Sequence, residues 1–308
     1  MNLKKPKFWD YKRPNIYAYL LLPLTFLLKI INLIKIKSKT KEIKIKTICV
    51  GNIYIGGTGK TSLSIKINEI LNKRNLKSCF VKKFYKEQID EQKLLKRRGK
   101  LFLSKKRLDA INQAEDENYE IAILDDGLQD RSINYDVNLV CFNNINWIGN
   151  GMTIPAGPLR EDINNLKKFE HIFLNGNLEN LEKLKQQVLK INPQINIHLG
   201  KYEAINLEEF KKDDKYLIFS GIGNHKTFIS MIKNYELNIL KNIEFPDHYQ
   251  YTENDINHIL KEANNLNCKI ITTEKDYLRL EGLKKNDIKF IKSELKIIDE
   301  EKFIKSII

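Results

Sequence analysis

Cysteine is scarce in this 308-residue chain: there are four, and none forms a C-x-x-C pair. A disulfide framework or a cysteine-ligated metal site would need cysteines at characteristic paired spacings, so neither is expected. The cysteines lie in apolar, strand-like runs, as Cys49 does in "TICVG" and Cys141 in "LVCFN". We therefore expect them to be small buried core residues in a reducing compartment.

The sequence also lacks an aromatic–glycine RNA-binding motif, a zinc-ligand spacing, a helix-turn-helix pattern, an internal repeat and a low-complexity linker. These absences matter because Lys+Arg outnumber Asp+Glu by 53 to 39, a net charge of +14, which favours an anionic partner. Lysine, isoleucine and asparagine are abundant throughout, so part of this charge can be compositional. We expect no nucleic-acid partner and rank a membrane surface or a nucleotide above one.

A long apolar run, "NIYAYLLLPLTFLLKIINLI", spans Asn15–Ile34 between lysine-containing flanks. No small-residue cleavage site follows it, which argues against a signal peptide. About 20 residues suffice for a spanning helix, but Pro23 interrupts the run and Thr25, Lys29 and Asn32 form a polar stripe. We expect a partly inserted amphipathic helix at a membrane interface, with a buried helix carrying one snorkelling lysine as the alternative.

Glycines crowd the stretch "VGNIYIGGTGKTSLSI", Val50–Ile65, which joins a strand-like run to a helical one. Glycines let backbone amides approach an anion, and the helix N-terminus adds partial positive charge. In the P-loop pattern, Lys60 would reach the terminal phosphates and Thr61 would bind Mg²⁺. The predicted nucleotide-binding residues are Gly56, Gly57, Thr58, Gly59, Lys60 and Thr61.

One position departs from the usual P-loop pattern, because Tyr54 stands where its first glycine is expected. A glycine-rich turn with a chance Gly-Lys-Thr is the plain alternative. A P-loop also requires a carboxylate at the end of a neighbouring strand, and "YEIAILDDGLQD" supplies Asp125 and Asp126. We expect this pair, with Thr61, to hold Mg²⁺, although acids before a glycine also commonly begin turns.

Strand-like runs alternate with helical stretches, which predicts an α/β fold. The expected architecture is P-loop NTPase-like: a mostly parallel sheet flanked by helices, a smaller second α/β domain, and the N-terminal membrane-associated helix. A break near 190–210 separates two sets of strands, so the predicted units are 1–40, 41–200 and 201–308. The expected strands are 44–50, 77–81, 119–124, 137–142, 170–174, 216–223, 238–245, 269–276 and 288–293.

Several motifs, taken together and in order, resemble the tetraacyldisaccharide 4′-kinase family of lipid A biosynthesis in Gram-negative bacteria. They extend from about residue 40 to 280 and read "VGNIYIGGTGKT", "DDGLQD", "GNGMTIPAGPLRE", "SGIGN", "FPDH" and "TTEKD". The apolar N-terminal segment is similar to that family's membrane-associated helix. The P-loop alone is unspecific, but its combination with "PAGPLRE" and the double aspartate is specific.

The resemblance implies an enzyme that transfers the γ-phosphate of ATP to the 4′-hydroxyl of a tetraacylated glucosamine disaccharide 1-phosphate. ATP and Mg²⁺ would be its cofactors, the lipid disaccharide 1-phosphate and a membrane surface its partners, and the cytoplasmic face of the bacterial inner membrane its location. By position, Lys60 would be catalytic and Asp125 with Asp126 would be the family's acidic pair. Arg160 and Glu161 match supporting residues of its "PLRE" site.

The resemblance also carries over a base. Asp90 in "QIDEQ" aligns with an acid proposed as the family's general base, and His248 in "FPDH" with the histidine that supports it. Plain alternatives stand beside these assignments. Asp90 and Glu91 can belong to a solvated helical face with alternating charges, His248 can be a loop histidine, and Arg160 with Glu161 can begin a helix.

Some positions depart from the family pattern. The family commonly has Ser-Arg-Gly-Tyr-Gly after the second strand, whereas this chain reads "VKKFYK" over 81–86, so either Lys82 or Lys83 can face the site. Asp130 stands where a histidine is usual. "TTEKD" is interpreted as a capping sequence and given no chemistry.

Two other classes of protein are alternatives. A membrane-associated switch ATPase uses a similar loop to drive dimerisation, but it typically has an additional lysine where this chain has Ile55. A basic lipid- or nucleic-acid-binding protein with a decayed nucleotide site would need neither the acid pair nor a base. A phosphorylated lipid formed from labelled ATP separates the three.

Overall fold

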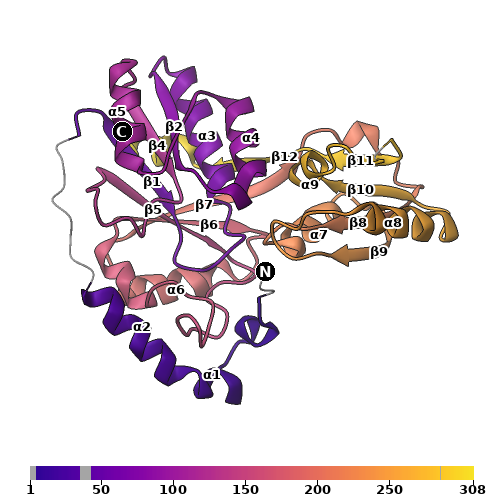
Figure 1. Ribbon diagram of the computed structural model, residues 1–308, viewed down its shortest axis with the longest axis horizontal. Helices are drawn as coiled ribbons and strands as arrows, with labels where there is room; N and C mark the ends of the chain where they lie inside the picture. The colour runs from indigo at the N-terminus through magenta and orange to yellow at the C-terminus, as the bar shows by residue number, and fades with distance from the viewer. Residues whose placement is uncertain (1–4, 35–42, 285) are drawn as a thin grey trace.

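The computed structural model describes residues 5–34, 43–284 and 286–308. It contains an eight-stranded and a four-stranded sheet with helices packed on them, so the expected α/β fold with a mostly parallel main sheet is confirmed. Figure 1 shows the smaller sheet beside one edge of the larger body and the N-terminal helices below it.

The larger sheet has the strand order β12-β7-β6-β5-β1-β4-β2-β3. All neighbouring pairs are parallel except β12 with β7. Because parallel strands end at one edge, the loops after β1, β4, β5 and β6 meet there. The strands are β1 (Lys46–Gly51), β2 (Ser78–Lys83), β3 (Leu101–Ser104), β4 (Ile121–Asp125), β5 (Val137–Asn143), β6 (His171–Gly176), β7 (Asn196–Ala204) and β12 (Ser293–Ile298).

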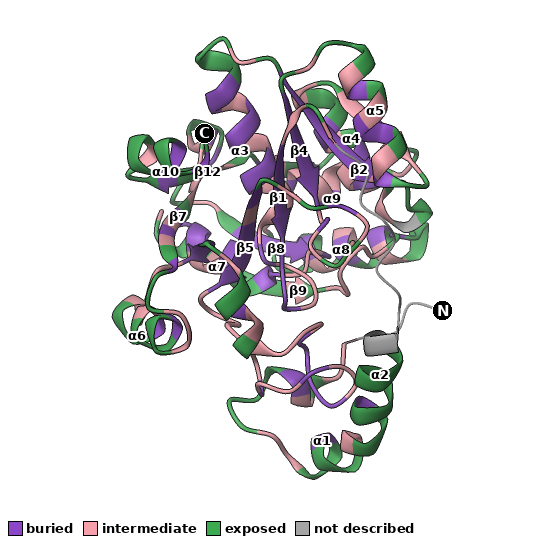
Figure 2. Ribbon diagram, turned by 90° about the vertical axis from the view of Figure 1, so that its left-hand side faces the viewer, coloured by how far each residue is buried: buried purple, intermediate pink, exposed green. Residues whose placement is uncertain are grey.

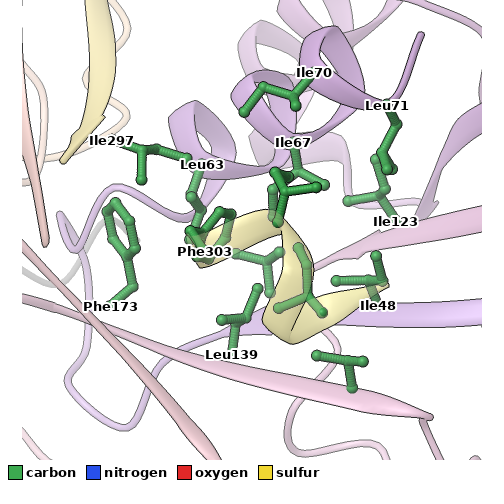
Figure 3. Packing of buried hydrophobic residues seen from close by; sticks show 14 of the residues in the cluster. Ile48, Leu63, Ile67, Ile70, Leu71, Ile123, Leu139, Phe173, Ile297 and Phe303 are labelled. Carbon is green, nitrogen blue, oxygen red and sulfur yellow. The ribbon is translucent and has the colours of Figure 1, made fainter. Parts of the chain in front are cut away.

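Helix α3 (Lys60–Lys73) anchors the centre of this sheet. Its apolar residues recur at helical spacing, and Leu63, Ile67 and Leu71 are completely buried. Figure 3 shows them meeting side chains of β1, β4, β5 and β6 and Phe303 of the last helix. The P-loop thus leads into a helix held along its length by the core. The other helices of this part are α4 (Ile89–Arg98), α5 (Arg107–Asp116), α6 (Leu181–Ile191) and α10 (Glu300–Ile307).

The smaller sheet is entirely parallel, in the order β11-β10-β8-β9. Apolar residues cover both of its faces, in two clusters that include Ile218 and Phe219 from adjacent positions of one strand. Its strands are β8 (Lys215–Ser220), β9 (Asn238–Glu244), β10 (Lys269–Thr273) and β11 (Ile288–Ile291), and its helices are α7 (His225–Lys233), α8 (Glu253–Asn265) and α9 (Glu274–Arg279).

The chain passes between the two sheets more than once. After β11 it returns to the larger sheet as β12, which pairs with β7, and α10 then packs into the main core (Figure 1). The division into 41–200 and 201–308 stays a prediction, and 1–40 includes residues outside the described ranges. Strands β3, β7 and β12 were not among the expected ones.

Helices α1 (Ile16–Leu20) and α2 (Leu22–Ile34) form the N-terminal segment, and Figure 2 shows them largely exposed. The buried-helix alternative is therefore wrong. Thr25 of the polar stripe is buried against the protein, and Lys29, whose side chain is exposed, lies 3.6 Å from Asp162. The apolar side chains lie outside. Within residues 5–34, 43–284 and 286–308, none of the helices has the length and apolarity that a membrane crossing needs.

Candidate active site

A cavity of about 350 Å³ lies at the carboxyl edge of the larger sheet, between it and the smaller sheet. The P-loop forms one wall, and loops of the smaller sheet form the opposite one. Glu91 and His248 face this space, as do Asp126 and Arg160. Residues far apart in sequence therefore share one solvent-accessible chamber.

Three P-loop glycines adopt left-handed backbone angles, with φ of 78° at Gly56, 31° at Gly57 and 81° at Gly59. A side chain at Gly57 would collide with the backbone of Gly223, and one at Gly59 would come within 2.5 Å of the Tyr202 hydroxyl. The loop therefore requires glycine both for its conformation and for its close contact with neighbouring segments.

Asparagine side chains fix the P-loop from behind. Asn175 donates to the Thr58 carbonyl at 2.8 Å, and Asn52 donates to the Thr58 hydroxyl at 2.9 Å. Asn224, from the smaller sheet, donates to the Gly57 carbonyl at 3.3 Å. These bonds hold the loop through two of its carbonyl groups and one hydroxyl.

Tyr54, which replaces the first glycine of the pattern, is a structural anchor. Its backbone bridges to Leu159, and its hydroxyl donates to Asp10 at 2.7 Å and accepts from Lys5 at 2.8 Å. The residue is only 1% exposed. The start of the loop is therefore tied to both the "PAGPLRE" segment and the N-terminal segment.

Lys60 and Arg160 converge on Asp126. Lys60 Nζ lies 3.7 Å from Asp126 Oδ1, and Arg160 donates to the two carboxylate oxygens at 2.9 and 3.5 Å. Burial by itself raises the pKa of Asp126, but the charges of Lys60 and Arg160 outweigh it and lower this pKa to about 2. Lys60, Asp126 and Arg160 thus form a compact charged cluster that faces the cavity.

Asp125 lies deeper than Asp126, at the end of β4. It is completely buried, and it accepts from Thr61 at 3.3 Å, from Ser64 at 3.4 Å and from Lys82 at 2.6 Å. In the part of the chain that the structure describes, no three His, Cys, Asp or Glu residues are grouped as a metal cage. A cation here would need oxygens from a nucleotide as well as from the protein.

Asp90, on α4, and His248, which lines the cavity, come into contact at its edge. His248 Nδ1 lies 3.3 Å from Asp90 Oδ1. Arg279 donates to Asp90 Oδ2 at 2.6 and 3.2 Å, and Lys275 lies 3.5 Å from it. Burial raises the pKa of Asp90, but the His248 hydrogen bond and these cations together hold the pKa well below its usual range.

Both acids of this helix are enclosed, so the interpretation of Asp90 and Glu91 as a solvated helical face is wrong. Asp90 is 6% exposed, and the Glu91 side chain is 14% exposed. Glu91 accepts from Lys82 and from Lys275, each at 2.8 Å. Burial raises the pKa of Glu91, but Lys275 and Lys82 lower it well below the usual value.

Arg160 and Glu161 are adjacent in the sequence, but their side chains make different contacts. Arg160 faces the cavity, where it also donates to Gln129 at 3.0 Å. Glu161 accepts from Gln129 at 3.3 Å and from Asn165 at 2.9 Å. The described contacts give Glu161 a supporting position behind Arg160. Asp130, at the unusual position, pairs with the buried Arg107 at 3.0 Å.

Sequence reasoning missed Lys275 and Arg279. Lys275 lies within "TTEKD", where a lysine between two acids was an available but weak signal, and it lines the cavity. Arg279 follows one turn later on α9 and bridges Asp90 to Asp276, with which it pairs at 2.8 Å. The capping expectation was right, because Thr273 accepts from the Asp276 amide at 3.0 Å.

A glycine-rich loop between β1 and α3, with Lys60 beside acids from the next strand, defines a P-loop phosphotransferase of the α/β class. The chain belongs to the family described as tetraacyldisaccharide-1-P 4'-kinase, whose sequence pattern it matches over residues 17–308. It is therefore a transferase of lipid A biosynthesis. This membership excludes the alternatives of a switch ATPase and of a binding protein.

Relatives of known name support this placement. The chain is 59% identical over 308 residues to the tetraacyldisaccharide 4′-kinase of Pelagibacter ubique, covering 100% of this chain and 98% of that one. It is 32% identical to the enzyme of Rickettsia canadensis, covering 93% and 91%. The crystal structure of LpxK from Aquifex aeolicus in complex with ATP has the same fold, with a TM-score of 0.66, 23% identity, and coverage of 95% and 99%.

Proposed function

We propose that this kinase uses the described cavity to transfer the γ-phosphoryl group of ATP to the 4′-hydroxyl of a tetraacylated glucosamine disaccharide 1-phosphate. The observation that carries the proposal is that the P-loop and the pair Glu91 and His248 line the same chamber. A phosphate donor on one wall and an acceptor hydroxyl on the other would meet within it.

The P-loop would hold the nucleotide phosphates on the backbone amides of Gly56, Gly57, Thr58 and Gly59. Lys60 and Arg160, which now share Asp126, would move their charges onto the transferred phosphoryl group. Phosphoryl transfer depends mainly on positioning and charge stabilisation. Asp126 would then be the partner of both cations only while no nucleotide is bound.

Mg²⁺ fits the residues at the end of β4. Thr61 and Asp125 bring a hydroxyl and a carboxylate oxygen within 3.3 Å, and Mg²⁺ is typically held by one or two carboxylates plus substrate phosphates. Thr61, Asp125 and Asp126 would hold it. When bound, Mg²⁺ would neutralise charge on the phosphates.

Asp90 would serve as the base for the sugar hydroxyl, with His248 supporting it. The pair's separation of 3.3 Å supports a shared proton path. His248 lines the cavity and Asp90 lies just behind it, so the proton would pass to Asp90 directly after a small movement or through the imidazole.

The N-terminal helices would place the enzyme on the cytoplasmic face of the inner membrane, where its lipid substrate is available. Their outward side is apolar, and lysines flank the segment, as suits an interfacial helix near anionic headgroups. The exposed residues are Ile16, Tyr17, Tyr19, Leu20, Leu24, Phe26, Leu27, Leu28, Ile30 and Ile31.

The test is a transfer assay with purified protein, labelled ATP, Mg²⁺ and the lipid disaccharide. The expected product is a labelled lipid whose phosphate is at the 4′ position, and Lys60→Ala should form almost none. Release of inorganic phosphate at an equal rate with and without the lipid, with no labelled lipid, would contradict the proposal.

A further inference from the structure

Lys82 is a buried cation in the middle of the acidic residues of the site. It is 1% exposed, and its ammonium lies 2.6 Å from Asp125 Oδ2 and 2.8 Å from Glu91 Oε2. The sheet register explains this position, because Val81 pairs with Leu124 and the next residues of β2 and β4 are Lys82 and Asp125. Two carboxylates within 2.8 Å of this ammonium favour its charged form.

The oxygen that Lys82 contacts is also the one nearest to the P-loop. Thr61 Oγ1 donates to the same Asp125 Oδ2, at 3.3 Å. A cation bound through Thr61 and Asp125 would thus approach an oxygen that already carries an ammonium. Repulsion between a divalent cation and a unit positive charge a few ångströms away opposes metal binding strongly in a partly buried site.

Glu91 extends this arrangement. Its second oxygen accepts from Lys275, and Lys275 also lies near Asp90. The ammonium of Lys82 therefore pairs with two carboxylates at once, and without it the group formed by Asp125 and Glu91 beside Thr61 would carry one more net negative charge.

We propose that Lys82 is a positioning residue that holds Asp125 and prevents a divalent cation from occupying this carboxylate until a nucleotide brings its own phosphate oxygens. The inference rests on the proposed role of Asp125 in metal binding. Mg²⁺ would then enter only together with ATP, whose phosphate oxygens offset the charge of the ammonium.

The test measures Mn²⁺ binding to the nucleotide-free, full-length protein by electron paramagnetic resonance, with circular dichroism as the check on folding. The wild-type protein should bind Mn²⁺ weakly, and Lys82→Met should bind it at least about tenfold more tightly because one positive charge is lost. Lys83→Met is the matched control: it removes a charge from the next residue, which lies over Tyr85, and it should leave Mn²⁺ affinity unchanged.

Lys82→Gln provides a second uncharged variant, and Lys82→Met with Glu91→Gln removes the buried ion pair together if the single variants do not fold. Equal Mn²⁺ affinity in wild type and a folded uncharged variant would overturn the inference, as would tight Mn²⁺ binding by the nucleotide-free wild type. Asp125→Asn separates the two proposals: if it leaves Mn²⁺–ATP binding unaltered, the metal role of Asp125 itself is wrong.

Discussion

Replacing Asp90 by Asn tests the proposed base most directly. The substitution keeps the shape of the side chain but removes a carboxylate that contacts His248 and Arg279. Arg279 retains Asp276 and the Gly221 carbonyl as partners, so the variant should stay folded. We expect it to lose about 1–3 kcal/mol of unfolding free energy, the usual worth of hydrogen bonds to charged groups.

The expected loss in kcat is about 10²–10³, in the lower part of the range for a general base. The reason is electrostatic: His248, Lys275 and Arg279 hold the pKa of Asp90 well below the ordinary carboxyl value, which keeps it ionised but makes it a weaker base. At about 1.36 kcal/mol for each tenfold change, this loss corresponds to about 3–4 kcal/mol in the activation barrier.

The same low pKa sets the pH dependence. Because the folded pKa of Asp90 lies below its unfolded value of about 3.9, its stabilising contribution is fully present above that value and disappears as pH falls through the folded pKa. The difference in unfolding free energy between wild type and Asp90→Asn should therefore shrink as pH falls below about 4.

The assay is steady-state transfer to the lipid, with ATP affinity measured separately and Asp116→Asn, on the exposed end of α5, as the control. ATP affinity should stay near the wild-type value in both variants. Wild-type turnover in a folded Asp90→Asn protein would refute the role of Asp90. Replacing Glu91 would not be an inert comparison, because this side chain is paired with both Lys82 and Lys275.

Three further predictions concern the other parts of the site. Lys60→Ala should lower turnover by orders of magnitude, because the lysine would no longer stabilise the negative charge on the transferred phosphoryl group. Normal turnover in this variant would show that Lys60 has no part in the mechanism. Asp125→Asn or Asp126→Asn should raise the Mg²⁺ concentration needed for half-maximal activity, and unaltered metal dependence in both would leave the pair as a turn. Leu20→Ser with Phe26→Ser, at side chains that are 69% and 62% exposed, should move protein from the membrane to the soluble fraction; unchanged partitioning would exclude this face as the anchor.

The P-loop could be predicted from sequence because its signal is local. Gly56, Gly57 and Gly59 are close in sequence, and left-handed backbone angles favour glycine. Asp125 was predictable for a similar reason, since an apolar run followed by acids marks the end of a buried strand. The general α/β alternation followed from strand-like runs separated by helical stretches.

The ion-pair chain from Asp125 through Lys82, Glu91 and Lys275 to Asp90 could not be predicted. Its members lie on β4, β2, α4 and α9, and their contacts depend on strand order and on how the two sheets meet. Sequence periodicity gives neither. The same limit explains why β12 was missed. All four strands of the smaller sheet lie between β12 and its pairing partner, β7, in the sequence.

Which way the polar stripe of α2 faces could not be predicted from the sequence. A helical pattern gives the two faces of a helix but not which one meets the protein. Thr25 accepts from the Ala156 amide at 3.4 Å and Lys29 pairs with Asp162, so the polar face is turned toward the "PAGPLRE" segment. The apolar face is thereby left exposed.

The contacts of the N-terminal segment determine what deletion of residues 1–38 should do. Besides the apolar face, the deletion removes Asp10, the partner of Tyr54 at 2.7 Å, and Trp9, which donates to the Pro155 carbonyl at 3.1 Å. Both contacts hold segments that carry the P-loop and Arg160. We therefore expect ATP binding to survive, but kcat toward detergent-dispersed lipid to fall by about 10- to 100-fold, because small displacements of catalytic groups are costly.

Leu20→Ser with Phe26→Ser is the matched control, since it alters only the outer face and should keep wild-type kcat in detergent. A deleted protein with wild-type kcat in detergent would mean that the N-terminal segment acts as an anchor alone.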